Sequence, residues 1–114
     1  MSNVELVTGY RDIVFSIHTL KVQRAWNERH GLPVDNLTVK IRQLVQELIR
    51  FVELLDTITD RRARNIICLR FVLGMSERDT AYSMNISRVT VNRICANTLR
   101  NLESVPPVPP PYAK

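Results

Sequence analysis

Apolar residues recur three and four positions apart along most of this 114-residue chain, and this spacing constrains the fold more than any other feature. Such spacing collects apolar side chains on one face of a helix. The alternation that is typical of half-buried strands never persists for more than a few residues, and only three glycines occur. We therefore predict an all-α fold of about five helices.

The first half predicts a long helical hairpin. Its first helix fits residues 4–29, where the 3–4 spacing places on one face Leu6, Tyr10, Ile13, Ile17 and Leu20. Gly31 and Pro33 end this helix, because glycine adopts the left-handed conformation at a helix end and proline cannot continue a helix.

The second helix carries an unusually wide apolar face. It begins near Asp35 or Asn36, either of which can cap it, and extends to about Ile58. Its two overlapping seams are Leu37, Ile41, Leu44, Leu48, Phe51 and Leu55, and Ile41, Val45, Leu48, Val52 and Leu55. One stripe is enough to pack against one neighbour, so this face indicates two: the first helix and either the second half of the chain or a second subunit. The alternative is a central core helix of a monomer.

Three capped helices are predicted in residues 59–104. Each begins at a side chain that can accept a hydrogen bond from the free N–H groups of a helix start, namely Thr59 or Asp60, Ser76, and Ser87. Gly74 closes the third helix. Asn85 and Ile86 form a tight turn between the fourth helix and the fifth, which reaches about Glu103.

These helices divide the chain into three parts. Residues 1–58 form an N-terminal helical scaffold and candidate oligomerisation hairpin, and residues 59–104 form a helix-turn-helix domain. Residues 105–114 are a flexible proline-rich tail. The tail contains "PPPY", which matches a proline-rich docking ligand but is also compatible with an unstructured end.

Basic residues are concentrated in the second half. Residues 1–59 balance seven Lys/Arg against seven Asp/Glu, whereas residues 60–104 carry eight arginines and four acids. Lys114 completes the net charge of +5. The planar, rigid guanidinium group of arginine suits phosphate and guanine better than the point charge of lysine does. The charge distribution predicts a polyanionic partner, double-stranded DNA above all.

The fifth predicted helix, residues 87–103, has two different faces. We expect its buried face to comprise Val91, Ile94, Thr98 and Leu102. The other side carries the candidate base-contacting residues Arg88, Val89, Thr90, Asn92 and Arg93. Arginine can bridge the two acceptors of guanine, asparagine can pair with adenine, and valine or a threonine methyl can contact the thymine methyl. With the fourth helix, this helix predicts a helix-turn-helix that inserts helix 87–103 in the major groove.

An ordered set of residues runs without gaps through about residues 54–104. In chain order it comprises Leu69-Arg70-Phe71, Gly74, Ala81, Ile86-Ser87, Val91, Leu99 and Leu102. This pattern resembles region 4 of bacterial sigma factors and the short sigma-like regulators of phages and prophages. The resemblance implies that the five candidate base-contacting residues occupy the positions by which that family reads the upstream promoter element.

The resemblance covers less than half of the chain. Residues 1–58 show no region 2, which a sigma factor needs to engage core polymerase and to melt a promoter. The resemblance therefore implies a sigma-like transcriptional regulator, phage or prophage encoded, rather than a stand-alone sigma factor. Because region 4 also contacts the polymerase flap, RNA polymerase is a further candidate partner, beside DNA and a second copy of the chain.

Backbone phosphates are expected to contact helix starts and nearby arginines. The candidates are Ser76, Arg78, Ser87, Arg61, Arg62 and Arg64. The last three open the third helix, where a positive charge meets an unfavourable helix dipole. An external anion would offset that dipole, but the alternative is a solvated face with Asp60 and Glu53 nearby.

Two alternative functions stay open from the sequence. The first is a small terminase-like subunit for DNA packaging, whose apolar helices would assemble a ring. The second is a sigma mimic that binds RNA polymerase or an anti-sigma partner without reading DNA. Mass in solution separates the first from a regulator, and affinity for duplex DNA separates the second.

Enzymatic and membrane functions find no support in the sequence. The acids are scattered among basic neighbours, and neither histidine has a partner with which it could form a catalytic or metal-binding group. We therefore predict no catalytic residue, metal or cofactor. The chain has no signal-peptide pattern and no apolar run of the ~18 residues that span a membrane. Cys68 and Cys95 suit reduced core positions in a cytoplasmic protein.

Overall fold

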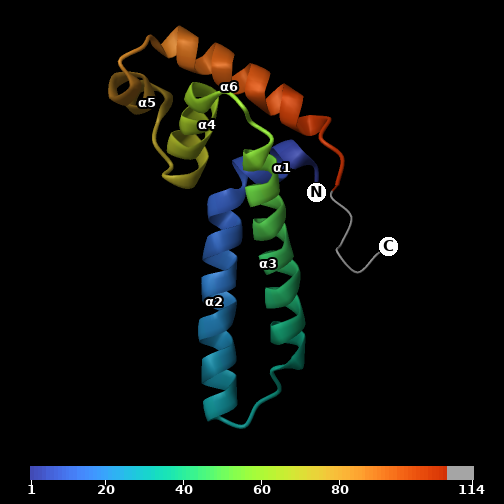
Figure 1. Ribbon diagram of the computed structural model, residues 1–114. Coiled ribbons are helices and arrows are strands. Elements are labelled where there is room, and N and C mark those ends of the chain that lie inside the picture. The colour runs from blue at the N-terminus through green and yellow to red at the C-terminus, as the bar shows by residue number, and fades with distance from the viewer. Residues whose placement is uncertain (108–114) are drawn as a thin grey trace.

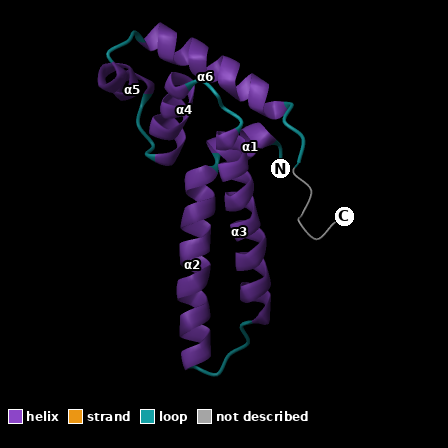
Figure 2. Ribbon diagram, in the orientation of Figure 1, coloured by secondary structure: helices purple, strands orange, loops and turns teal. Residues whose placement is uncertain are grey.

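The computed structural model describes residues 1–107 and confirms the all-α prediction, since no strand occurs among them (Figures 1 and 2). The helices are α1 (Asn3–Thr8), α2 (Tyr10–Arg29), α3 (Asp35–Asp56), α4 (Arg61–Ile67), the π-helical η1 (Cys68–Val72), α5 (Glu77–Met84) and α6 (Arg88–Glu103). Helices α2 and α3 form an antiparallel arm, and the other elements gather at one end of it as a head (Figure 1). The proline-rich motif "PPPY" lies outside the described residues.

The predicted continuous helix over residues 4–29 is two helices. Gly9 separates them, and its N–H donates to the Glu5 carbonyl at 2.9 Å. Ser2 caps α1, accepting from the Glu5 N–H at 3.1 Å, so the short helix has its own start signal. The Asn3 amide donates to the carbonyls of Leu102, at 2.8 Å, and Val105, at 3.0 Å. The first nine residues therefore belong to the head, and only α2 and α3 form the hairpin.

The arm is held together by the first of the two predicted seams of α3. Ile41 and Phe51 of this seam are buried, as are Ile13 and Ile17 on α2. The rings of Tyr10 and Phe51 stack with their centroids 4.3 Å apart where the arm meets the head. Val52, in the second seam, is exposed. The wide apolar face of α3 is thus only partly covered.

The loop at the tip of the arm contains one confirmed prediction and one error. Gly31 has a φ of 69°, and the Leu32 N–H donates to the Asn27 carbonyl at 2.8 Å, as in a Schellman motif. The expectation that Asp35 or Asn36 caps α3 is wrong, because the N-cap is Val34 and makes no side-chain hydrogen bond. Asp35 instead occupies the first turn, where a negative charge is favoured by the helix dipole.

One apolar core connects the elements of the head. Its most completely buried side chains come from four helices: Leu6, Val7, Leu54, Ile66, Ile67 and Val91. Helix α6 contacts α1, α4 and α5 (Figure 1). The buried residues of α6 lie on one side of the helix, and within residues 1–107 its opposite side is exposed.

A π-helical turn joins α4 to the start of α5. Asp60 caps α4, as predicted, accepting from the Arg62 N–H at 2.9 Å. The Leu73 N–H donates to the Cys68 carbonyl at 3.0 Å, which is the wider spacing of a π-helix. Gly74 then reverses the chain with a φ of 73°.

Substitution of Gly74 by alanine is expected to lower the free energy of unfolding. The left-handed conformation costs a residue with a Cβ about 1–2 kcal/mol, and the new Cβ would also displace the guanidinium group of exposed Arg11, a flexible side-chain end that can move aside at little cost. Gly31→Ala is the matched control, because its φ is also left-handed but no atom lies within 4 Å of the added Cβ. Urea unfolding should show a lower free energy of unfolding for both variants. The decrease for Gly74→Ala should be at least as large as the decrease for Gly31→Ala. An unchanged midpoint for Gly74→Ala would contradict this account.

Candidate nucleic-acid interface

Helices α5 and α6 are joined by the tight turn that the sequence predicts. Asn85 adopts a left-handed conformation with a φ of 57°, and the Ile86 N–H donates to the Ala81 carbonyl at 3.0 Å. Asparagine tolerates this conformation better than most residues. Ser87 then caps α6, accepting from the Thr90 N–H at 3.1 Å. Because Ala81 is small and buried, α5 can pack closely against α6.

The side chains of α6 divide into a buried and an exposed face. The buried side comprises Val91, Cys95, Thr98 and Leu102, and Ile94, which we also predicted to face inward, is half-buried. Of the five predicted base-contacting residues, four are exposed: Arg88, Val89, Asn92 and Arg93. Val89 is 77% exposed although it is apolar. The first two turns of α6 therefore present arginine, valine and asparagine to the surroundings.

Thr90 differs from the other four predicted contacts. Its side chain is half-buried, and its Oγ1 atom lies 2.8 Å from the Ser87 Oγ atom. The two hydroxyl groups share a hydrogen bond at the start of α6. Thr90 is thus part of the capping arrangement, and its methyl group is less available than the neighbouring side chains.

The two predicted serine contacts also serve as helix caps. Ser76 accepts from the Asp79 N–H at 3.0 Å and is exposed at the start of α5. It borders a surface pocket with Arg11 and Asp12 of α2, at the opposite end of α5 from the turn. Ser87 lies at the start of α6, next to the exposed predicted contacts. The structure therefore places only Ser87 directly beside them.

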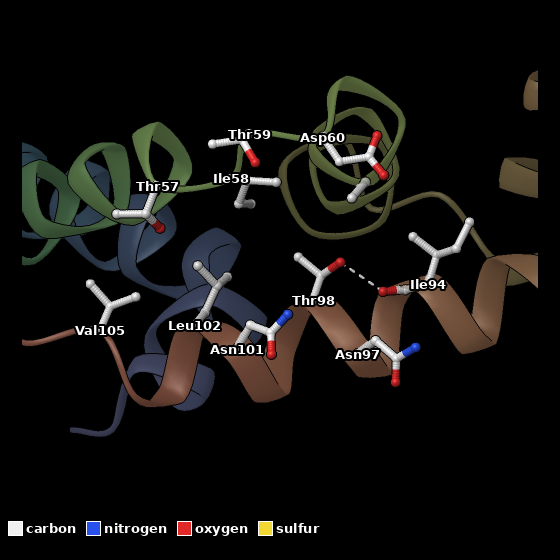
Figure 3. Close-up of a pocket in the computed structure, with 11 residues that line it drawn as sticks. Thr57, Ile58, Thr59, Asp60, Ile94, Asn97, Thr98, Asn101, Leu102 and Val105 are labelled. Atoms are coloured by element: carbon white, nitrogen blue, oxygen red, sulfur yellow. Dashed lines mark hydrogen bonds between the residues drawn. The ribbon is translucent and has the colours of Figure 1, made fainter.

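The three arginines of α4 form a separate group. Arg61 and Arg62 are exposed, whereas Arg64 is half-buried and its Nη1 atom donates to the Ile58 carbonyl at 3.3 Å. The start of α4 faces the middle of α6, because a pocket is lined by both segments (Figure 3). The start of α4, which carries these arginines, therefore lies opposite the later turns of α6 and not its first turn.

That pocket has a volume of about 350 Å³ and is mainly lined by uncharged side chains. Figure 3 shows Asn97 and Asn101 on α6 and Asp60 across from them. The Thr98 hydroxyl donates to the Ile94 carbonyl at 2.7 Å. Asp60 is the only ionisable residue of the lining, and its carboxylate already caps α4. The pocket therefore offers polar contacts but no pair of groups suited to acid–base chemistry.

Two exposed residues, one on α5 and one on α6, were not among the contacts that we predicted from the sequence. Tyr82 on α5 is 91% exposed and lies four positions after Arg78, which is also exposed. Residues four apart share one face of a helix, so this spacing was the available signal. Arg100 follows Arg93 by seven positions and is exposed on the same side of α6.

The described residues contain neither a metal centre nor a membrane span. Within residues 1–107, no three His, Cys, Asp or Glu side chains gather closely enough to bind a metal ion. None of the helices there combines the length and the apolar character needed to cross a bilayer.

Both cysteines are free thiols with weakened acidity. Burial raises the pKa of the Cys95 thiol, and the nearby charge of Arg70 lowers it by a smaller amount. Burial also raises the pKa of Cys68, against a smaller opposing effect of Arg64. Because the thiolate is the nucleophile, both groups are poorly reactive at neutral pH.

The rate of alkylation should differ between the folded and the unfolded chain, because burial lowers the reactivity of both thiols. Iodoacetamide at pH 7.5 is expected to modify the half-buried Cys68 slowly and the buried Cys95 more slowly still. Urea should accelerate both reactions, since it exposes the thiols and returns each pKa to its ordinary value. Peptide mass spectrometry would measure the two rates. Fast labelling of Cys95 in the folded protein would contradict its burial.

No protein-family model, curated protein or solved structure matches this chain. The resemblance to sigma region 4 therefore depends on the residues of the chain itself.

Proposed function

We propose that this protein is a sequence-specific double-stranded DNA-binding regulator of transcription that inserts the start of α6 in the major groove. One observation carries this proposal. The first two turns of α6 expose Arg88, Val89, Asn92 and Arg93, while the opposite side of the same helix is buried in the head. An exposed helix start of this composition fits the major groove, which admits one helix and displays the hydrogen-bonding edges of the bases.

The charge of the second half supports the same proposal. Its eight arginines against four acids provide attraction to the phosphate backbone. Exposed Arg78, on the helix before the turn, is suited to a phosphate contact, as is the start of α6 at Ser87. Phosphate contacts of this kind orient a recognition helix, and base contacts provide the sequence preference.

The family and location belong to the proposal as well. We infer a sigma region 4-like regulator, phage or prophage encoded, that acts in the cytoplasm, where free thiols such as Cys68 and Cys95 persist. RNA polymerase is a further partner in this proposal, as the resemblance implies.

A second candidate is a sigma mimic that binds a protein and not DNA. Its support is two exposed side chains of the head, Leu73, which is 64% exposed, and Tyr82, which is 91% exposed. Aromatic residues are enriched at protein interfaces. In this case the arginines of α6 would meet acidic side chains of the partner, and affinity for duplex DNA would be negligible.

Replacing Arg88 and Arg93 together by alanine is expected to weaken binding to mixed-sequence duplex DNA by about tenfold or more. An arginine at a base is worth about 1–3 kcal/mol, and loss of a phosphate contact reduces the salt dependence by about one unit of slope per contact. Fluorescence anisotropy across a salt series would measure both quantities.

The matched control is Arg29→Ala/Lys40→Ala, which removes the same charge from exposed positions near the tip of the arm. It should retain most of the wild-type affinity. Equal losses in both double variants would assign binding to net charge and not to α6. Absence of wild-type binding at low salt would overturn the DNA proposal and favour the protein-binding alternative.

Tyr82→Ala separates the two candidate functions on the surface of α5. If α5 approaches DNA, the phenol group can contact a phosphate, and we expect a two- to fivefold loss of affinity, about 0.5–1 kcal/mol. Tyr82→Phe removes only the hydroxyl group and should reproduce most of that loss. Full affinity in both variants, combined with loss of polymerase binding in pull-down, would instead assign Tyr82 to a protein interface.

A further inference from the structure

Helix α3 carries a further row of side chains, distinct from the two predicted seams, in which two of the three apolar residues are exposed. It follows the spacing 3, 4, 3, 4 and consists of Arg42, Val45, Ile49, Val52 and Asp56; we call this the outer seam. Ile49 is 47% exposed, Val52 is 55% exposed and Val45 is half-buried. Such spacing is that of a helix-pairing surface. It runs beside the seam that holds the arm together, and within residues 1–107 its Ile49 and Val52 are exposed, while the neighbouring Arg50 donates to the carbonyls of Val105 and Pro106.

The charges of the outer seam are arranged symmetrically about its centre. Arg42 precedes Ile49 by seven positions and Asp56 follows it by seven. A positive charge therefore lies at one end of the outer seam and a negative charge at the other. Both side chains are exposed. The one ion pair within residues 1–107 joins Arg50 and Glu53 at 3.4 Å, so neither Arg42 nor Asp56 has an ion-pair partner among them.

We propose that the outer seam pairs with the outer seam of a second copy of this chain, antiparallel and about a twofold axis near Ile49. In this arrangement Val45 of each copy lies near Val52 of the other, and Arg42 of each copy faces Asp56 of the other. A twofold axis uses the same patch on both copies and therefore forms each charge pair twice. A parallel pairing would place like charges opposite each other, which disfavours it.

Another exposed apolar face of the arm fits a second copy less well. It lies on α2 and contains Phe15, Val22 and Trp26. Exposed Arg11 and Asp12 lie at its start and exposed Arg29 at its end, so this face lacks the single opposite charge at each end that the outer seam has. Antiparallel pairing of two such faces would bring Arg11 of each copy near Arg29 of the other. The charge pattern therefore favours the outer seam of α3 for self-association.

The size of the contact predicts a weak dimer. Arg42 and Asp56 lie 14 positions apart, which corresponds to about 21 Å of helix. A contact between two helices over this length lies at or below the lower end of standard specific interfaces, which begins at about 1,200 Å² in total. We expect a dissociation constant in the micromolar range, and this expectation does not depend on DNA binding.

Charge reversal tests the pairing in the full chain without DNA. Arg42→Glu and Asp56→Arg should each raise the dimer dissociation constant tenfold or more, because each places like charges opposite each other twice. Mixing the two variants should restore association as a heterodimer, since both charge pairs are then complementary. Sedimentation equilibrium over a concentration series would measure association, and circular dichroism would verify that each variant remains helical.

The matched control is Lys40→Glu, which makes the same charge change at an exposed position on another face of α3. It should dimerise like the wild type. Three results would overturn the proposal: a wild-type chain that stays monomeric at high micromolar concentration, a ring of many copies, or a mixture of the two charge variants that remains monomeric. The first and third leave the DNA-binding proposal untouched, because the anisotropy experiment tests it separately.

Discussion

Burial of one face of α6 is the interaction on which the rest of the head depends. Val91 and Leu102 anchor the two ends of this helix in the core that α1, α4 and α5 share. Because a helix has a fixed 3.6-residue repeat, burial of these positions determines which side chains turn outward at its start. The candidate recognition residues thus owe their exposure to the packing of the opposite face.

Helix boundaries were predictable wherever a side chain or a glycine determines them locally. Asp60, Ser76 and Ser87 cap their helices, and Gly31 takes the left-handed conformation, as the sequence indicated. The break at Gly9 was not predictable, because apolar spacing continues across it and α1 turns aside to contact α6 from far along the chain. The π-helical turn of η1 likewise has no pattern of its own in the sequence.

The candidate site likewise has features that the sequence predicted and features that it did not. Helical spacing alone separated Arg88, Asn92 and Arg93 from the buried positions of α6, and their exposure agrees with it. It could not anticipate the hydrogen bond between the hydroxyl groups of Thr90 and Ser87, which depends on rotamers at the helix start. It also could not locate the α4 arginines, since their distance from the turn is set by how α4 packs across α6.

The arm presents a different physical problem from the head. Two antiparallel helices bury one seam of each, and the outer seam of α3 lies largely outside that contact, with Ile49 and Val52 exposed. The exposed parts of Ile49 and Val52, about half of each residue, do not add to the hydrophobic stabilisation of an isolated hairpin while they contact water. A complementary helix would bury them and restrain the arm at once. The seam between Arg42 and Asp56 has the charge order that its own antiparallel copy would match, so one surface can provide both the apolar contact and its orientation.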